Sequence, residues 1–270
     1  MSEKMITYSL SLEELSMCLA MLNRPDLGQT ILRTYYDNLT KEQVDSRMTA
    51  ASHSLLARGI CGLTPEGTPR LEKDLEQAIL PIAVYDLVFQ FNLVTGDNAV
   101  NSNIHVRKGK TFTSHNVQVG VIHLLEHGAF KQLPDFLLDV LEDYGGKEKI
   151  DMSSKTTITL AILGQALNAS TKKEDAYKIL QSLNWDASII KALGDDLSAS
   201  LGRGTLVRVE AKSGTDEKTL EEAPKRTLLF LKGKMRTWCF EFTSPKDDAV
   251  AQVKSVTRKE FSEIITAFLN

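Results

Sequence analysis

Cysteine is scarce in this chain, and the few cysteines form no recognisable pattern. Cys18, Cys61 and Cys239 are odd in number, lie far apart and include no C-x-x-C pair. A disulfide framework needs paired cysteines and a zinc ribbon needs closely spaced ones, so neither is predicted. We expect all three to be reduced and buried, acting as small apolar side chains.

An excess of charge of one sign is also missing. The 32 Lys and Arg residues nearly balance the 35 Asp and Glu residues, giving a formal net charge of -3. The basic residues are scattered, and the lack of a basic stripe disfavours binding to nucleic acid. No apolar run is long enough for a membrane span and no signal-like segment opens the chain. Membrane insertion is therefore not expected, and the cytoplasm is the expected location.

Motifs that hold phosphates or activate a serine are absent. The sequence contains no G-x-x-x-x-G-K-[ST], no G-x-G-x-x-G and no G-x-S-x-G. These motifs place backbone N–H groups around a phosphate or expose a nucleophile on a strained turn. We therefore expect no cofactor and a non-catalytic protein, with one enzyme alternative considered below.

Helix signals dominate the first eighty residues. Capping boxes of the form S/T-x-x-E/Q precede two runs with helical periodicity, at Ser11–Glu14 and Thr40–Gln43. The second helix is expected to end at Gly59, where glycine suits the C-terminal turn. Another helix is predicted to start at Thr68–Pro69 and to end at Pro81, since proline is tolerated in the first helical turn.

Strand signals follow. Val84 to Val94 alternates with period 2, as expected for a half-buried strand. Two more strand-like runs, Asn103 to Arg107 and Thr111 to Leu125, are joined by the turn Lys108-Gly109-Lys110. An amphipathic helix is predicted from Pro134 to Tyr144.

The same order of elements then recurs after a glycine-rich joint at Gly145 to Lys149. Helices, strands and a closing helix are predicted at Ser154–Asn168, Lys172–Leu183, Ala187–Leu201, Thr205–Lys212, RTLLFLK, MRTWCFEF, Ala249–Val256 and Arg258–Leu269. This order indicates an internal duplication, with halves 1-145 and 146-270. We predict an α+β fold in which a helices–β-meander–helix unit occurs twice. The two meanders are expected to join edge to edge into one central, mostly antiparallel sheet flanked by helical groups.

The helix end Ala51 to Ile60 (ASHSLLARGI) resembles the corresponding helix end of the EspG group, the chaperones of mycobacterial type VII secretion systems. The region Ile104 to Leu141 is similar to the strand, strand, "GVxxL", helix run of that group. The resemblance implies a chaperone that holds a helical secretion substrate soluble in the cytoplasm and brings it to the export machine.

A second resemblance is local. Gly120 to Lys131 contains H-x-x-E-H and is similar to the signature of inverted-zincin metallopeptidases. That family implies zinc bound by His123 and His127, with Glu126 as general base. A zinc site of this kind needs both histidines on one face of a helix, but Val117 to Leu125 alternates as a strand. A third ligand is also lacking, because Glu210 lies in a period-2 strand. We therefore keep the metallopeptidase as an alternative and expect no metal.

The expected partner is another protein with a helical binding segment. We expect it to bind the more polar face of the sheet, which the period-2 pattern assigns to five residues: Asp86, Gln90, Asn92, Arg208 and Glu210. The charged loop Ser213 to Lys225 is a second candidate, as a mobile arm. A structural role in a secretion or defence assembly is the remaining alternative, and homo-oligomerisation is left open.

Overall fold

A computed structural model describes residues 5–152, 156–211, 225–244 and 246–270. The chain forms two compact units. Unit 1 comprises residues 1–88 and 102–133, and unit 2 comprises residues 89–101 and 134–270, so strands β4 (Leu87–Thr95) and β5 (Asn98–Arg107) contribute to both. The predicted halves have a different boundary, at residue 145. They were defined by a repeat in the sequence, whereas the two units are defined by compact packing.

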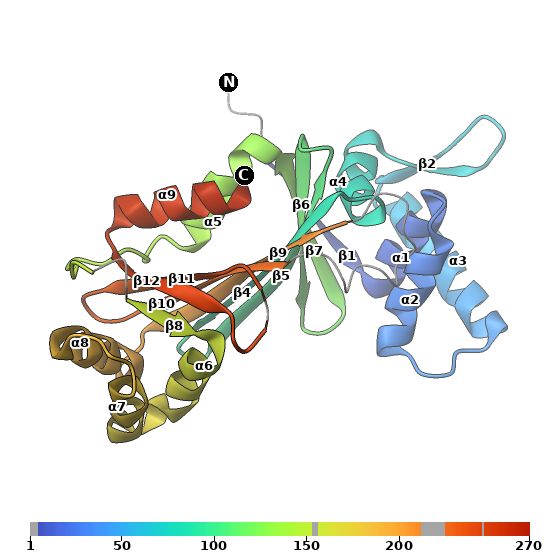
Figure 1. Cartoon of the computed structure of the whole chain (residues 1–270). Coiled ribbons are helices and arrows are strands. Elements are labelled where there is room, and N and C mark those ends of the chain that lie inside the picture. The colour runs from blue at the N-terminus through green and yellow to red at the C-terminus, as the bar shows by residue number, and fades with distance from the viewer. Residues whose placement is uncertain (1–4, 153–155, 212–224, 245) are drawn as a thin grey trace. The chain divides into compact units, whose positions relative to one another are not determined.

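Helices α1 to α4 form the helical part of unit 1 (Figure 1). The two predicted capping boxes are present, with Ser11 preceding α1 and Thr40 preceding α3. Gly59 follows α3 with φ 68°, a left-handed conformation that favours glycine. The helices span α1 Leu12–Met21, α2 Pro25–Tyr35, α3 Lys41–Ala57 and α4 Lys73–Ala83.

The predicted start and end of α4 are both wrong. Residues Pro69–Leu71 form strand β3, which pairs with β2 (Cys61–Leu63), and the helix begins only at Lys73. Pro81 lies inside the last turn, where it removes one backbone hydrogen bond but does not stop the helix. The amide of Val84 still donates to the carbonyl of Leu80 at 2.9 Å and closes the helix.

The sheet of unit 1 pairs β1 (Ile6–Ser11), β7 (Ile122–Ala129), β6 (Thr111–Gln118) and β5 in that order, all antiparallel. The single strand predicted from Thr111 to Leu125 is therefore two strands. Val119, Gly120 and Val121 lie between them, and Val119 and Gly120 have φ 51° and 74°. Because Gln118 pairs with Ile122 across these three residues, residues of the same parity face the same side in both strands, and the inside–outside alternation continues in phase. The sequence pattern alone could not separate the two strands, and strand β1 was not predicted at all.

Unit 2 contains the longer series of strands. Its helices and 3-10 turn are α5 Leu133–Val140, α6 Leu160–Asn168, η2 Ala169–Thr171, α7 Lys173–Gln181, α8 Ala187–Ser198 and α9 Arg258–Leu269, and η1 (Phe130–Gln132) precedes α5. Its strands are β8 Thr157–Thr159, β9 Gly202–Glu210, β10 Lys225–Lys232, β11 Thr237–Phe242 and β12 Val250–Val256. Strand β8 was not predicted, because it directly precedes α6 and was included in that helix.

Across hydrogen-bonded neighbours the strand order is β1-β7-β6-β5-β4-β9-β10-β11-β12-β8. Strand β4, from the first predicted half, thus lies next to β9, from the second. The pairs from β1 to β5 and the pairs from β9 to β8 are antiparallel. The predicted α+β fold with a mostly antiparallel sheet is confirmed.

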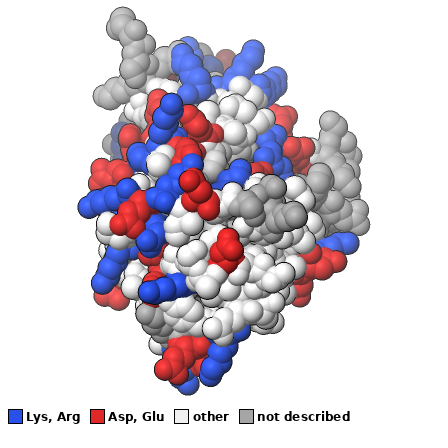
Figure 2. Space-filling model, turned by 60° about the vertical axis from the view of Figure 1, so that its left-hand side comes forward, with Lys and Arg blue, Asp and Glu red and all other residues white. Residues whose placement is uncertain are grey.

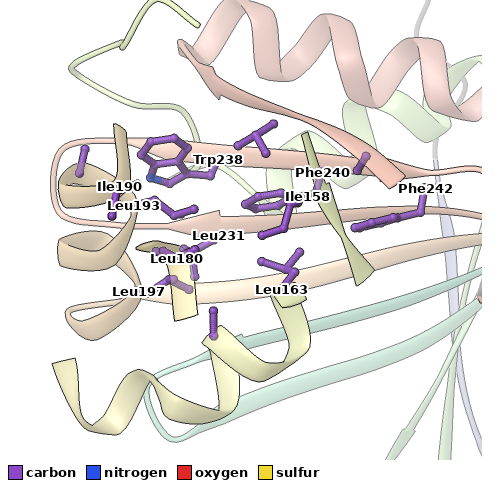
Figure 3. Close-up of a cluster of buried hydrophobic side chains, with 14 residues drawn as sticks. Ile158, Leu163, Leu180, Ile190, Leu193, Leu197, Leu231, Trp238, Phe240 and Phe242 are labelled. Atoms are coloured by element: carbon purple, nitrogen blue, oxygen red, sulfur yellow. The ribbon is translucent and has the colours of Figure 1, made fainter. Parts of the chain in front are cut away.

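Each unit has its own apolar core. In unit 1, Leu15, Cys18 and Leu19 of α1 pack with residues of α3, α4 and strands β1 and β7. In unit 2, Trp238, Phe240 and Phe242 of β11 pack against α6, α7 and α8 (Figure 3). Cys18, Cys61 and Cys239 are free and buried, as predicted. Among the described helices, none has both the length and the hydropathy needed to cross a bilayer.

Candidate functional site: an apolar groove in unit 2

The two faces of the unit 2 sheet are assigned by strand register, because directly paired residues project to the same side. One face, called here the bundle face, carries Trp238, Phe240 and Phe242 toward α6–α8. Trp238 is anchored there by its indole Nε1–H, which donates to Asp196 at 2.9 Å. Burial raises the pKa of Asp196, although Trp238 and Arg236 act against this shift.

The opposite face, called the α9 face, carries Phe230. Its ring contacts those of Tyr144 and Phe261 at centroid distances of 5.2 and 5.6 Å. Gly204, paired with Phe230, leaves room for this ring, because an added Cβ would lie 2.4 Å from it. Helices α5 and α9 thus cover one face of this sheet, and α6–α8 cover part of the other (Figure 1).

Within the described ranges of the chain, the bundle face is open at β4 and β9. Gln90 and Asn92 are exposed, and the amide of Asn92 donates to the hydroxyl of Thr205 at 3.3 Å, which places both on the bundle face. Thr205 pairs with Leu229, which pairs with Phe240, so this strip continues the face that α6–α8 cover farther along. The sheet therefore presents polar side chains from two paired strands, next to the apolar side of α6–α8.

A groove of about 230 Å³ lies at one end of this strip. We call it the α6–β4 groove. The helical wall contributes Leu167 of α6, and β4 contributes Val94. All described lining residues are Val94, Gly96, Leu167, Ser170, Leu197, Ser200, Leu201, Gly202, Arg203 and Leu231, of which only Arg203 is charged.

The groove has exposed aliphatic side chains at its edge. Val94 is 39% exposed and Leu201 is 46% exposed. The adjoining segment 156–171, which includes α6, contains no charged residue. A concave, aliphatic surface with a few hydroxyl groups and one cation suits an apolar segment better than a charged one.

The five residues predicted to bind a partner do not share one face of the sheet, so they do not form the single polar face that the period-2 pattern indicated. Gln90 and Asn92 lie on the open strip of the bundle face. Arg208 pairs with Arg226, which has the same orientation as Phe230, so Arg208 and Glu210 project to the α9 face. The guanidinium of Arg208 forms an ion pair with Glu210 at 2.9 Å there. The sequence showed that these residues alternate within each strand but not how β4 and β9 are paired.

Asp86 belongs to unit 1, before β4. Its carboxylate accepts a hydrogen bond from the backbone amide of Lys108, in the β5–β6 turn. The carboxylate thus has a local structural role in holding this turn. Of the loop suggested as a mobile arm, Ser213 to Lys225, residues 213–224 lie outside the described residues and Lys225 begins β10.

The H-x-x-E-H segment is a strand, so the metallopeptidase alternative is wrong. His123, Glu126 and His127 all lie in β7. At about 3.3 Å of rise per residue, two strand residues four apart are separated by about 13 Å, too far to share a metal ion. Glu126 projects to the face opposite the two histidines, and burial raises its pKa. No three His, Cys, Asp or Glu side chains in the described part of the chain are placed to hold a metal.

Both histidines have other partners. His127 Nδ1 lies 3.0 Å from the hydroxyl of Thr113, and His123 Nδ1 lies 2.7 Å from His115 Nε2. His105 and His115 are half-buried between the sheet and the helices of unit 1. His53, on α3, is exposed.

Groove residues such as Val94, Leu167 and Leu201 were not singled out from the sequence. Val94 and Leu201 look like ordinary strand and helix-end residues. The uncharged run at 156–171 was the available signal, since a surface helix without charge is unusual.

Charge on the molecular surface agrees with the composition. Figure 2 shows basic and acidic side chains interspersed, next to a broad area that carries neither. The face in this view therefore has no field of one sign that would attract nucleic acid.

This fold is similar to that of a solved chaperone of a type VII secretion system. Among solved structures, the chain matches the Mycobacterium tuberculosis type VII secretion system chaperone EspG5, solved in complex with a PE25-PPE41 dimer. The TM-score is 0.61 and the sequence identity is 12%, over 97% of this chain and 95% of that chain. No protein-family model and no curated protein matches the sequence. The likeness establishes the fold, and it confirms the predicted EspG resemblance at that level.

Proposed function

We propose that this protein is a non-catalytic chaperone or adaptor that binds an apolar helical segment of a partner protein in the α6–β4 groove. The single observation that carries the proposal is the groove itself, in which aliphatic side chains remain exposed at the edge of a partly uncovered sheet face. Exposed apolar surface in a concave site is typical of a site that another protein covers. The shared fold with a type VII secretion chaperone supports the same role.

The physical task would be to shield the partner from water until it is handed on. Val94 and Leu201 would contact its apolar side chains, while Asn92 and Arg203 would bind polar groups at its ends. We place this role in the cytoplasm, with a secretion substrate as the client.

A tagged-protein capture experiment from the source cells tests the proposal. Leu201→Glu places a charge in the groove, and we expect it to abolish retention of a specific partner. Val250→Glu is the matched control, because Val250 is 56% exposed on β12 and does not line the groove. Equal retention by wild type, Leu201→Glu and Val250→Glu would refute the groove as the binding site.

We also infer that the two predicted halves arose by duplication. The first runs β1, four helices with an inserted hairpin, β4–β7 and α5, and the second runs β8, three helices, β9–β12 and α9. The strand order supports this, because counting inward from either end of the sheet meets corresponding strands: β1 and β8, β7 and β12, β6 and β11, β5 and β10, β4 and β9.

A further inference from the structure

Four of the five histidines of the chain lie on the sheet of unit 1, and three of them form a continuous row. His115 of β6 stacks on His123 of β7, with ring centroids 5.0 Å apart and planes 25° apart. His105 of β5 continues the row, 6.4 Å from His115. We call His105, His115 and His123 the histidine row.

Aromatic rings close both ends of the row. Tyr85 meets His105 edge-on at 5.3 Å, and Tyr35 of α2 meets His123 edge-on at 6.2 Å. His123 is 1% exposed. Among the described residues, His105 Nδ1 and His123 Nε2 are buried without a hydrogen-bond partner.

The row lies where the helices of unit 1 meet its sheet. Leu10 and Leu125, which share its face, belong to the core that α1, α3 and α4 form with the sheet. Thr113, on the same face between His105 and His127, donates through its hydroxyl to the carbonyl of Ala78 in α4 at 2.7 Å. Any change that forces the row apart therefore acts on the contact between helices and sheet.

In the described part of the chain, the charged groups around the row offer no ready counter-ion. The negative charge of Glu13, in α1, acts to raise the pKa of His123. However, the Glu13 carboxylate already accepts hydrogen bonds from Tyr36 and Arg47 at 2.8 Å each. The other titratable or charged groups facing the four histidines are Asp74 of α4, Tyr8 of β1, Tyr35 of α2, Tyr85 before β4 and Arg107 of β5.

A proton added to this row would be costly. A buried imidazolium has two N–H donors and a net charge, and both need partners. A second proton would place like charges on neighbouring rings. Burial lowers the pKa of His105 to about 4 and, together with the charges of His105 and His123, lowers that of His115 to about 3.

We propose that the histidine row is an acid-sensitive latch that holds the helices of unit 1 on its sheet. At neutral pH the uncharged rings stack, and one N–H is shared between His115 and His123. Acidification favours an open form in which the imidazoles reach water and take up protons. The latch is independent of the α6–β4 groove, which lies in unit 2.

The sign of the pH dependence follows from the linkage between proton binding and opening. In the open form each histidine has a pKa near 6.5, and in the closed form the pKa is lower, so the open form binds more protons. The full stability of the closed form is present above about pH 6.5 and decreases as the pH falls toward 4. Each histidine contributes up to a tenfold change in the opening constant per pH unit across that window.

Hydrogen exchange of the full-length protein between pH 4.5 and 7.5 tests the latch, with rates corrected for the intrinsic pH dependence of exchange. In wild type, protection of amides in α1 and β5–β7 should fall steeply below pH 6.5. His105→Phe keeps a ring next to Tyr85 and removes one titrating site. The change of its opening constant with pH should therefore be smaller than in wild type, by up to tenfold per pH unit.

His53→Gln is the control, because His53 is exposed on α3 of the same unit; its slope should equal that of wild type. If His105→Phe does not fold, His115→Gln gives the same measurement, since its amide can still bond to His123. Protection that does not change with pH in wild type would overturn the proposal. So would equal slopes in His105→Phe and His53→Gln, or row imidazoles that titrate near pH 6.5 in NMR spectra of the folded protein.

Discussion

Val119 has a backbone conformation that its side chain disfavours. It has φ 51° and is 91% exposed at the tip of the β6–β7 hairpin. A β-branched residue is a poor choice there, because the left-handed region brings Cβ close to the following carbonyl, at a cost of about 1–2 kcal/mol. Asparagine or glycine is the usual residue in such a turn. Because Val119 also continues the period-2 pattern, the sequence predicted one long strand in place of this hairpin.

Val119→Asn should therefore stabilise the protein by about 1 kcal/mol, because asparagine tolerates the left-handed region. The free energy of unfolding in urea measures the effect. Val121→Asn is the matched control, since Val121 is 48% exposed in the same hairpin and does not have a positive φ. A gain of the same size in both variants would show that reduced apolar exposure, rather than backbone strain, is responsible.

Helix α1 is held by more than its capping box. The Glu14 carboxylate accepts from the amide of Ser11 at 2.8 Å, and also from Ser54 and Arg58 of the α3 region at 2.7 Å each. Burial acts to raise the pKa of Glu14, but these hydrogen bonds outweigh it and the net pKa is lowered. The box of α3, between Thr40 and Gln43, has exposed members and no such link.

Glu14→Gln should cost about 2–3 kcal/mol of unfolding free energy at pH 7, because a buried, charge-assisted set of bonds is lost. Thr40→Ala should cost about 1 kcal/mol, the usual value for a cap. Because the folded-state pKa of Glu14 is lowered, the difference should be present above about pH 4.5 and disappear as the pH falls below it. Equal costs for the two variants at pH 7 would contradict the link between α1 and α3.

Across the chain as a whole, the predicted halves meet at β4 and β9 within unit 2. Residues 89–101, from the first half, belong to the same compact unit as residues 146–270. Gly204 is essential to this pairing, because an added Cβ would lie 2.8 Å from the carbonyl oxygen of Asn92 as well as against Phe230. The second half therefore lacks part of its sheet when it is made alone.

Coexpressed pieces 1-145 and 146-270 should copurify in equal amounts, because β4 of one piece completes the sheet of the other. Gly204→Val in the second piece should abolish copurification, and Val250→Glu should not. Size-exclusion chromatography with mass measurement distinguishes the outcomes. Two separate, folded pieces would contradict the predicted dependence of the halves on each other.

Local patterns predicted much of the fold. Capping boxes located α1 and α3, glycine located the end of α3, and the period-2 pattern of β4 showed Phe89, Phe91 and Leu93 as buried. The period-2 pattern of Val117 to Leu125 indicated a strand at the H-x-x-E-H segment and argued against a zinc helix, and the structure shows that strand. Short strands escaped prediction because three residues, as in β8, are too few to show a period.

Properties that depend on neighbours along the chain were readable from the amino-acid order, because capping and alternation act over a few residues. The groove and the histidine row were not, because each is assembled from elements separated by dozens of residues. Whether Arg208 faces the same side as Asn92 depends on strand register, and whether His115 meets His123 depends on a turn that the pattern conceals. Those relations are set by packing between elements, for which local periodicity carries no information.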